Sequence, residues 1–104
     1  MIYTLVNTIL IPGKMSEYAE VASKELIPLF PKIGMGLVAS FHAYTGNMNE
    51  IYTLNSFKDM VDYQKVMQAQ RTNKEWLSIN GKTNQFRLSQ TMTIIEPNPW
   101  SPMK

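Results

Sequence analysis

Two turn segments limit the fold most strongly: Pro12-Gly13 separates a segment of strand pattern from one of helical period, and residues 46–50 carry the turn residues of a hairpin. Residues 2–11 are rich in β-branched and aromatic side chains, which predicts a strand. The next segment has apolar residues at three- and four-residue spacing, which predicts a helix that Pro28 and Pro31 end. Residues 37–45 and 50–57 are then predicted as two strands of a hairpin.

The second half of the chain carries two patterns typical of helix starts. Ser56 with Asp59 matches a capping box, and Thr72 with Glu75 matches another. We expect the first box to begin a long helix and the second to begin a short helix that Gly81 ends. Residues 86–96 are predicted as the last strand, and residues 97–104 as an extended tail.

The resulting order, β-α-β-β-α-(α)-β, predicts an α+β fold of the ferredoxin-like type in a single domain, residues 1–104. Its four-stranded antiparallel sheet would carry the helices on one face. Apolar residues occur on both faces of the predicted strands, and an uncovered apolar face usually marks an interface. We therefore expect a homodimer in which two sheets pair into an α/β barrel, with the barrel interior as the binding pocket.

Composition excludes several kinds of site. The chain has no Cys and one His, so it lacks the residues for thiolate zinc sites and iron–sulfur clusters, and we expect no metal and no cofactor. The 10 basic and 8 acidic residues are interleaved, which argues against nucleic-acid binding. No apolar run approaches the length of a membrane span and no targeting segment is recognised, so we expect a cytoplasmic protein without membrane contact.

Several short segments, taken in order, resemble the NIPSNAP family from residue 1 to residue 104. They are Ile2-Tyr3, Pro12-Gly13-Lys14 with Tyr18, Gly46 with Asn49, Trp76, and Trp100-Ser101-Pro102. The resemblance implies a dimeric α/β barrel, an architecture shared with small cofactor-free monooxygenases and some haem-degrading enzymes, and it implies no settled reaction. The chain departs from the family at Thr53 and Asn55, where a His and a Trp are usual, and its set of acid–base groups is correspondingly smaller.

Candidate site residues lie on neighbouring strands. Alternation places Ser40, His42 and Tyr44 on one face of the second strand, and we expect this face to line the barrel. Further candidate ligand-binding residues lie near them on the first and third strands: Thr4, Thr8, Thr53 and Asn55. In a catalytic role, His42 would be a general base near neutral pH, and Tyr44 would orient a substrate or donate to an oxyanion.

Two functions follow from this set, and the sequence does not decide whether the protein is an enzyme. The first is a barrel that binds a small apolar or aromatic molecule, or a protein partner, without turnover. The alternative is a cofactor-independent oxygenase or isomerase that acts on a small aromatic or enolisable substrate with His42 as base. Haem is disfavoured because the single His lies in a strand, and because Asn7 belongs to an alternation set expected to face the helices.

Overall fold

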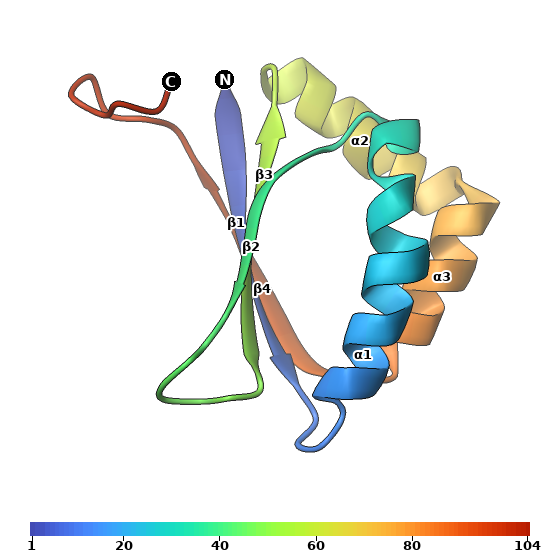
Figure 1. Ribbon diagram of the computed structural model, residues 1–104. Helices are drawn as coiled ribbons and strands as arrows, with labels where there is room; N and C mark the ends of the chain where they lie inside the picture. The colour runs from blue at the N-terminus through green and yellow to red at the C-terminus, as the bar shows by residue number, and fades with distance from the viewer.

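The computed structural model describes all residues from Met1 to Lys104, and it confirms the predicted order of strands and helices. The longer elements are β1 (Ile2–Leu10), α1 (Met15–Val21), β2 (Gly36–His42), β3 (Glu50–Phe57), α2 (Met60–Thr72), α3 (Lys74–Asn84) and β4 (Arg87–Ile95). The sheet order is β2-β3-β1-β4, and every neighbouring pair is antiparallel. All three α-helices lie on one side of the sheet, as the ferredoxin-like plan requires (Figure 1).

The helical segment after β1 changes its winding as it proceeds. Residues Ala22–Leu26 form a π-helical turn, in which the N–H of Ile27 donates to the carbonyl of Ala22. Two short 3₁₀ turns follow, Ile27–Leu29 and Pro31–Ile33. Gly34, in the left-handed conformation with φ 84°, then ends the segment before β2.

The predicted helix caps are wrong by one to three residues. Asp59 caps α2 by accepting a hydrogen bond from the N–H of Asp62, so Ser56 remains in β3. Asn73 caps α3 through the N–H of Trp76, and Thr72 ends the preceding helix. Asp and Asn are as good at the N-cap as Ser and Thr, which is why the capping-box pattern predicted the N-cap at the wrong residue. Helix α3 also continues past the predicted stop at Gly81 to Asn84.

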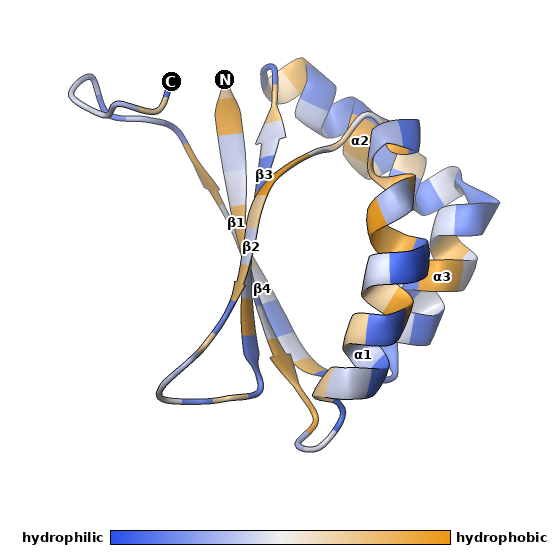
Figure 2. Cartoon of the chain, in the orientation of Figure 1, coloured by the Kyte–Doolittle hydropathy of each residue, from blue (hydrophilic) through white to orange (hydrophobic).

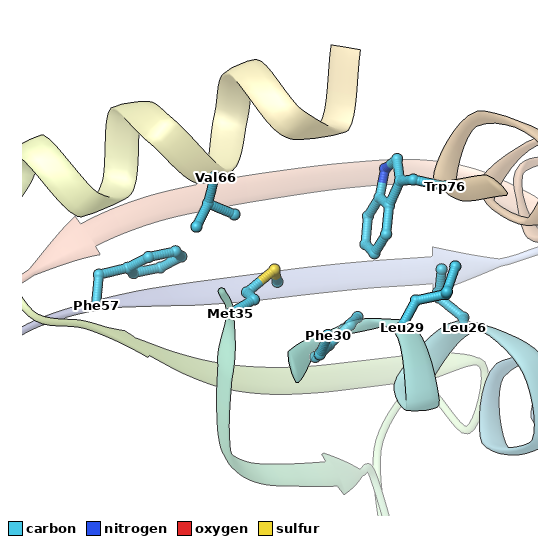
Figure 3. Packing of buried hydrophobic residues seen from close by; sticks show 7 residues of the cluster. All are labelled: Leu26, Leu29, Phe30, Met35, Phe57, Val66 and Trp76. Carbon is cyan, nitrogen blue, oxygen red and sulfur yellow. The ribbon is translucent and has the colours of Figure 1, made fainter. Parts of the chain in front are cut away.

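The hydrophobic core fills part of the layer between the sheet and the helices. Figure 3 shows Val66 of α2 above Phe57 of β3 and Met35, with Trp76 of α3 facing Phe30. The rings of Phe30 and Trp76 are tilted by 40° with centroids 5.8 Å apart. Only 14 of the 104 residues are buried, so a single chain leaves much of its apolar surface in contact with solvent.

The other face of the sheet has no helix over it. Hydrophobic residues occur along the strands as well as the helices, and the C-terminal tail and the loop between β2 and β3 extend on this side (Figure 2). By strand register this open face carries Leu5, Phe41, Leu54 and Ile95, and Phe41 is 62% exposed. None of the helices is long and apolar enough to span a bilayer.

Candidate functional site

A cavity of about 250 Å³ lies between the sheet and the helices of the single chain. Apolar walls come mainly from the helical segments and the short connection before β2: Leu26, Ile27, Phe30, Met35, Met67 and Trp76. Polar groups come mainly from the strands. The cavity exceeds the roughly 150 Å³ that accommodates benzene in an engineered protein and is below the roughly 300 Å³ at which drug-sized sites begin. Its size therefore suits a molecule with one ring or a short chain.

Buried polar side chains form one part of the cavity wall. Thr4, Thr8 and Asn55 are each no more than 2% exposed, and all three line the cavity. The Nδ2 of Asn55 lies 3.5 Å from Thr4 Oγ1, at the long limit for a hydrogen bond. The Oδ1 of Asn55 is buried without any partner. A buried amide oxygen left unpaired is costly, so this position favours a ligand that donates a hydrogen bond.

Arg87, at the start of β4, supplies the positive charge of the cavity. Its Nη1 donates to Asn80 Oδ1 at 2.9 Å, and its guanidinium lies 5.8 Å from the centre of the Tyr18 ring. Its Nε is buried and has no hydrogen-bond partner. None of the four ion pairs of the chain includes Arg87. The cavity thus holds a guanidinium that is oriented by neutral neighbours and lacks a counter-ion.

The sequence-based site residues divide into two groups. Thr4, Thr8, Thr53 and Asn55 all line the cavity, whereas Ser40, His42 and Tyr44 do not. Ser40 lies on the edge strand β2, and its Oγ is 3.4 Å from Oγ1 of the lining residue Thr53 on β3. His42 is exposed at the end of β2, and Tyr44 lies in the following loop with 83% of its surface exposed.

The expected orientation of the sheet is wrong. The face that carries Thr4 and Thr8 faces the helices, and the cavity lies beneath those helices and not on the open face. Asn7, expected to face the helices, lies on the open face, where its Nδ2 donates to Glu50 Oε1 at 3.0 Å. The prediction failed because polar residues occupy the helix-facing positions around the cavity, where an ordinary core would have apolar ones.

Sequence reasoning missed Arg87 with its neighbours Tyr18 and Asn80, and it also missed the lining residue Gln90. Gln90 Nε2 donates to Thr8 Oγ1 at 3.0 Å, which links β4 to β1 across the cavity wall. One signal was available: Arg87 is one of only two arginines and begins a strand in which no other residue is charged. Its pairing with Tyr18 and Asn80 could not be inferred, because both lie in other elements.

Acid–base groups are scarce in the cavity. Its lining contains no Asp, Glu or His, and Tyr18 and Arg87 are its only ionisable side chains. The chain also has no group of three His, Cys, Asp or Glu placed to hold a metal ion. A carboxylate–phenol pair does occur on the open face, where Tyr52 donates to Glu50 Oε1, and this hydrogen bond raises the pKa of the Tyr52 phenol above 10.0.

Comparison with known proteins places the chain among solved structures of similar fold. The NIPSNAP family profile matches residues 3–102. A protein from Agrobacterium tumefaciens is 25% identical, with a TM-score of 0.90 and full coverage of both chains. A NIPSNAP domain protein from Burkholderia xenovorans, described as uncharacterized, is 13% identical with a TM-score of 0.90, covering 98% of this chain and 99% of its own.

A more distant similarity shows how widely the fold is used. A structure described as an antibiotic biosynthesis monooxygenase has a TM-score of 0.71 at 10% identity, and the match covers 95% of this chain and all of that one. At this identity the similarity concerns the fold alone. No curated protein sequence matches the chain.

Proposed function

The chain belongs to the NIPSNAP family, and we propose that it binds a small, largely apolar molecule in the cavity between its sheet and helices. The observation that carries the proposal is the composition of the cavity wall. Buried hydrogen-bonding side chains are set into an apolar lining, which is the usual composition of a ligand site and an unfavourable one for an empty core.

The same wall favours binding over the oxygenase or isomerase alternative. A general base must come within hydrogen-bond reach of the proton that it removes. His42, the base of that alternative, is exposed and does not line the cavity, and no carboxylate takes its place. Tyr44, its partner in that alternative, is also remote from the cavity. We therefore retain binding without turnover as the proposed function.

We further propose that the protein works as a homodimer joined through the open sheet faces. Leu5, Phe41 and Ile95 leave between 39% and 62% of their surface exposed there, and exposed apolar side chains on an uncovered sheet face are typical of an interface. We favour a second copy of the chain as the partner of this face because one chain alone buries few residues. The C-terminal tail also extends on the open side, where it would contact the second copy (Figure 1).

Fluorescence of 1-aminoanthracene, a neutral apolar dye, tests the proposed binding site. The dye should bind the wild-type protein and brighten. Val6 lines the cavity, so Val6→Phe should fill part of it and weaken dye binding at least tenfold. The matched control is Val61→Phe, at a 57% exposed position of α2 outside the cavity, which should bind like the wild type.

Circular dichroism would confirm that both variants fold. If Val6→Phe is unfolded, Thr53→Leu offers a smaller change at another lining position. Equal dye binding by the wild type and a folded cavity variant would place the dye elsewhere and refute the proposed site. Absence of dye binding by the wild-type protein would refute it as well.

A further inference from the structure

The guanidinium of Arg87 is the one feature of the cavity that a neutral apolar ligand would leave unexplained. Partial burial of a positive charge is unfavourable unless another group compensates it. Asn80 and Tyr18 orient the guanidinium, but neither carries a negative charge at neutral pH. The buried Nε donor remains free. We propose that the ligand is an organic anion whose carboxylate binds Arg87, an inference that rests on the proposed binding function.

A carboxylate fits the geometry of the free donors. The planar guanidinium offers its N–H groups as a fork, and a carboxylate can accept from two of them at once. Asn80 occupies Nη1, which leaves the Nε side of the fork for such an acceptor. The Tyr18 ring beneath the guanidinium is an aromatic surface that can pack against the apolar part of a ligand next to its carboxylate.

Asn55 indicates what lies at the other end of the ligand. Strand register pairs Arg87 with Leu10 and Asn55 with Thr4, so the two side chains start from positions six residues apart along β1. At about 3.3 Å per residue these backbone positions are about 20 Å apart, and the long Arg87 side chain covers part of that distance, so a ligand that reaches both groups is extended. The unpaired Oδ1 of Asn55 accepts a hydrogen bond. The ligand class is therefore an elongated carboxylate with a short apolar body and a far hydroxyl group.

The first test is whether the cavity prefers an anion. Octanoate and octan-1-ol have chains of equal length and differ in charge, and each can displace 1-aminoanthracene from the wild-type protein. A charge-assisted pair with Arg87 predicts that octanoate binds about 10- to 100-fold more tightly than octan-1-ol. Equal affinities would overturn the anion proposal while leaving the binding function intact. Failure of both compounds and of the dye would refute the binding function itself.

Substitution of Arg87 then assigns the preference to one residue. In Arg87→Gln the ratio of the octanoate and octan-1-ol affinities should fall to about one, and in Arg87→Lys part of the preference should remain because the charge is kept. Lys74→Gln is the control, since it removes the same charge from the exposed start of α3, outside the cavity, and should keep the wild-type ratio. A wild-type ratio in Arg87→Gln would overturn the assignment.

The far end is tested with 8-hydroxyoctanoate. A neutral hydrogen bond to Asn55 predicts that this compound binds the wild-type protein about 2- to 10-fold more tightly than octanoate. In Asn55→Leu, which has no acceptor, octanoate should bind at least as well as the hydroxylated compound. A hydroxyl group that weakens binding to the wild-type protein would overturn the role of Asn55 without affecting that of Arg87.

Discussion

Asn7 and Asn55 lie on opposite faces of the same sheet, and each has a buried side-chain oxygen without a hydrogen-bond partner. Asn55 Oδ1 belongs to the cavity wall, whereas Asn7 lies beside Glu50 on the open face. Buried polar atoms without partners are uncommon in folded proteins. Their positions coincide with the two surfaces to which we assign a ligand and a second copy of the chain.

Asn55→Leu should make the empty protein more stable. Leucine has the same branched outline, with the same number of side-chain heavy atoms, and removes the unpaired oxygen, at the loss of one long contact to Thr4. We expect the free energy of unfolding in urea to rise by about 1 kcal/mol. A control at an exposed polar position, Gln64→Leu, should change it by less than about 0.5 kcal/mol. A loss of stability in Asn55→Leu would show that the amide is satisfied in solution.

The Glu50–Tyr52 hydrogen bond predicts a loss of stability at high pH. The pKa of a tyrosine phenol in the unfolded chain is about 10.0, and this hydrogen bond raises the pKa of Tyr52 in the folded protein above that value. At a pH between the unfolded and the folded pKa, the folded protein keeps a proton that the unfolded chain releases. The stability that the protonated phenol contributes is present below pH 10.0 and is lost as the pH rises through the folded-state value. Urea unfolding of wild type and Tyr52→Phe at pH 8 and pH 11 should show a wild-type advantage that shrinks at the higher pH; an advantage that grows would contradict the assignment.

Phe41→Glu should convert the proposed dimer to a monomer. The side chain is 62% exposed on the open face, so a single chain should tolerate the change, whereas a sheet-to-sheet interface would bury its charge. Sedimentation velocity should show a dissociation constant raised at least 100-fold. Leu77→Glu, at a 50% exposed position of α3 on the helical side, should leave the association unchanged. A wild-type protein that sediments as a monomer would remove the basis of this prediction.

The tail should strengthen the same interface. Trp100 is 81% exposed in the single chain, which is unusual for the largest apolar side chain, and the tail extends on the open side of the sheet (Figure 1). Deletion of residues 97–104 should weaken the dimer about tenfold by sedimentation, and Trp100→Ala should reproduce most of that loss. If both proteins associate like the wild type, the tail has no part in the interface.

His42→Ala should change neither stability nor ligand binding. The imidazole is exposed at the end of β2 and outside the cavity, and surface substitutions of this kind change stability by about 0.5 kcal/mol or less. Thermal unfolding and dye titration of the variant are the measurements. A dye affinity reduced severalfold at unchanged thermal stability would instead bring His42 into the site and restore support for the enzymatic alternative.

The four strands could be predicted from the sequence, although β2 ends at His42 and not at residue 45 as predicted, but the orientation of the sheet could not. Strand β3 has the predicted bounds, because its β-branched and aromatic residues are clearly delimited by turns. In β1 both alternation sets mix polar and apolar residues, with Thr4 and Thr8 in one and Asn7 in the other. A prediction based on polarity places the threonines on the open face, but in the structure they face the helices because they line a cavity there.

The site could be predicted only in part for a related reason. Thr4, Thr8, Thr53 and Asn55 were found together because strand neighbours follow from alternation and pairing. The positive end of the cavity depends on contacts among Tyr18, Asn80 and Arg87, which come from three elements far apart in sequence. Such contacts depend on the angle at which helices cross the sheet, and no local pattern encodes that angle.

The shape of the cavity depends on the number of residues in the π-helical turn at Ala22–Leu26. Each residue of a regular α-helix rotates the chain by about 100°, so positions eight apart are about 80° out of phase. Tyr18 and Leu26 are eight apart, yet both line the cavity, and the wide turn between them reduces that difference. Shortening the turn by one residue would keep the composition almost unchanged while rotating Leu26 and the residues after it. The number of residues in this segment therefore helps to determine the shape of the cavity.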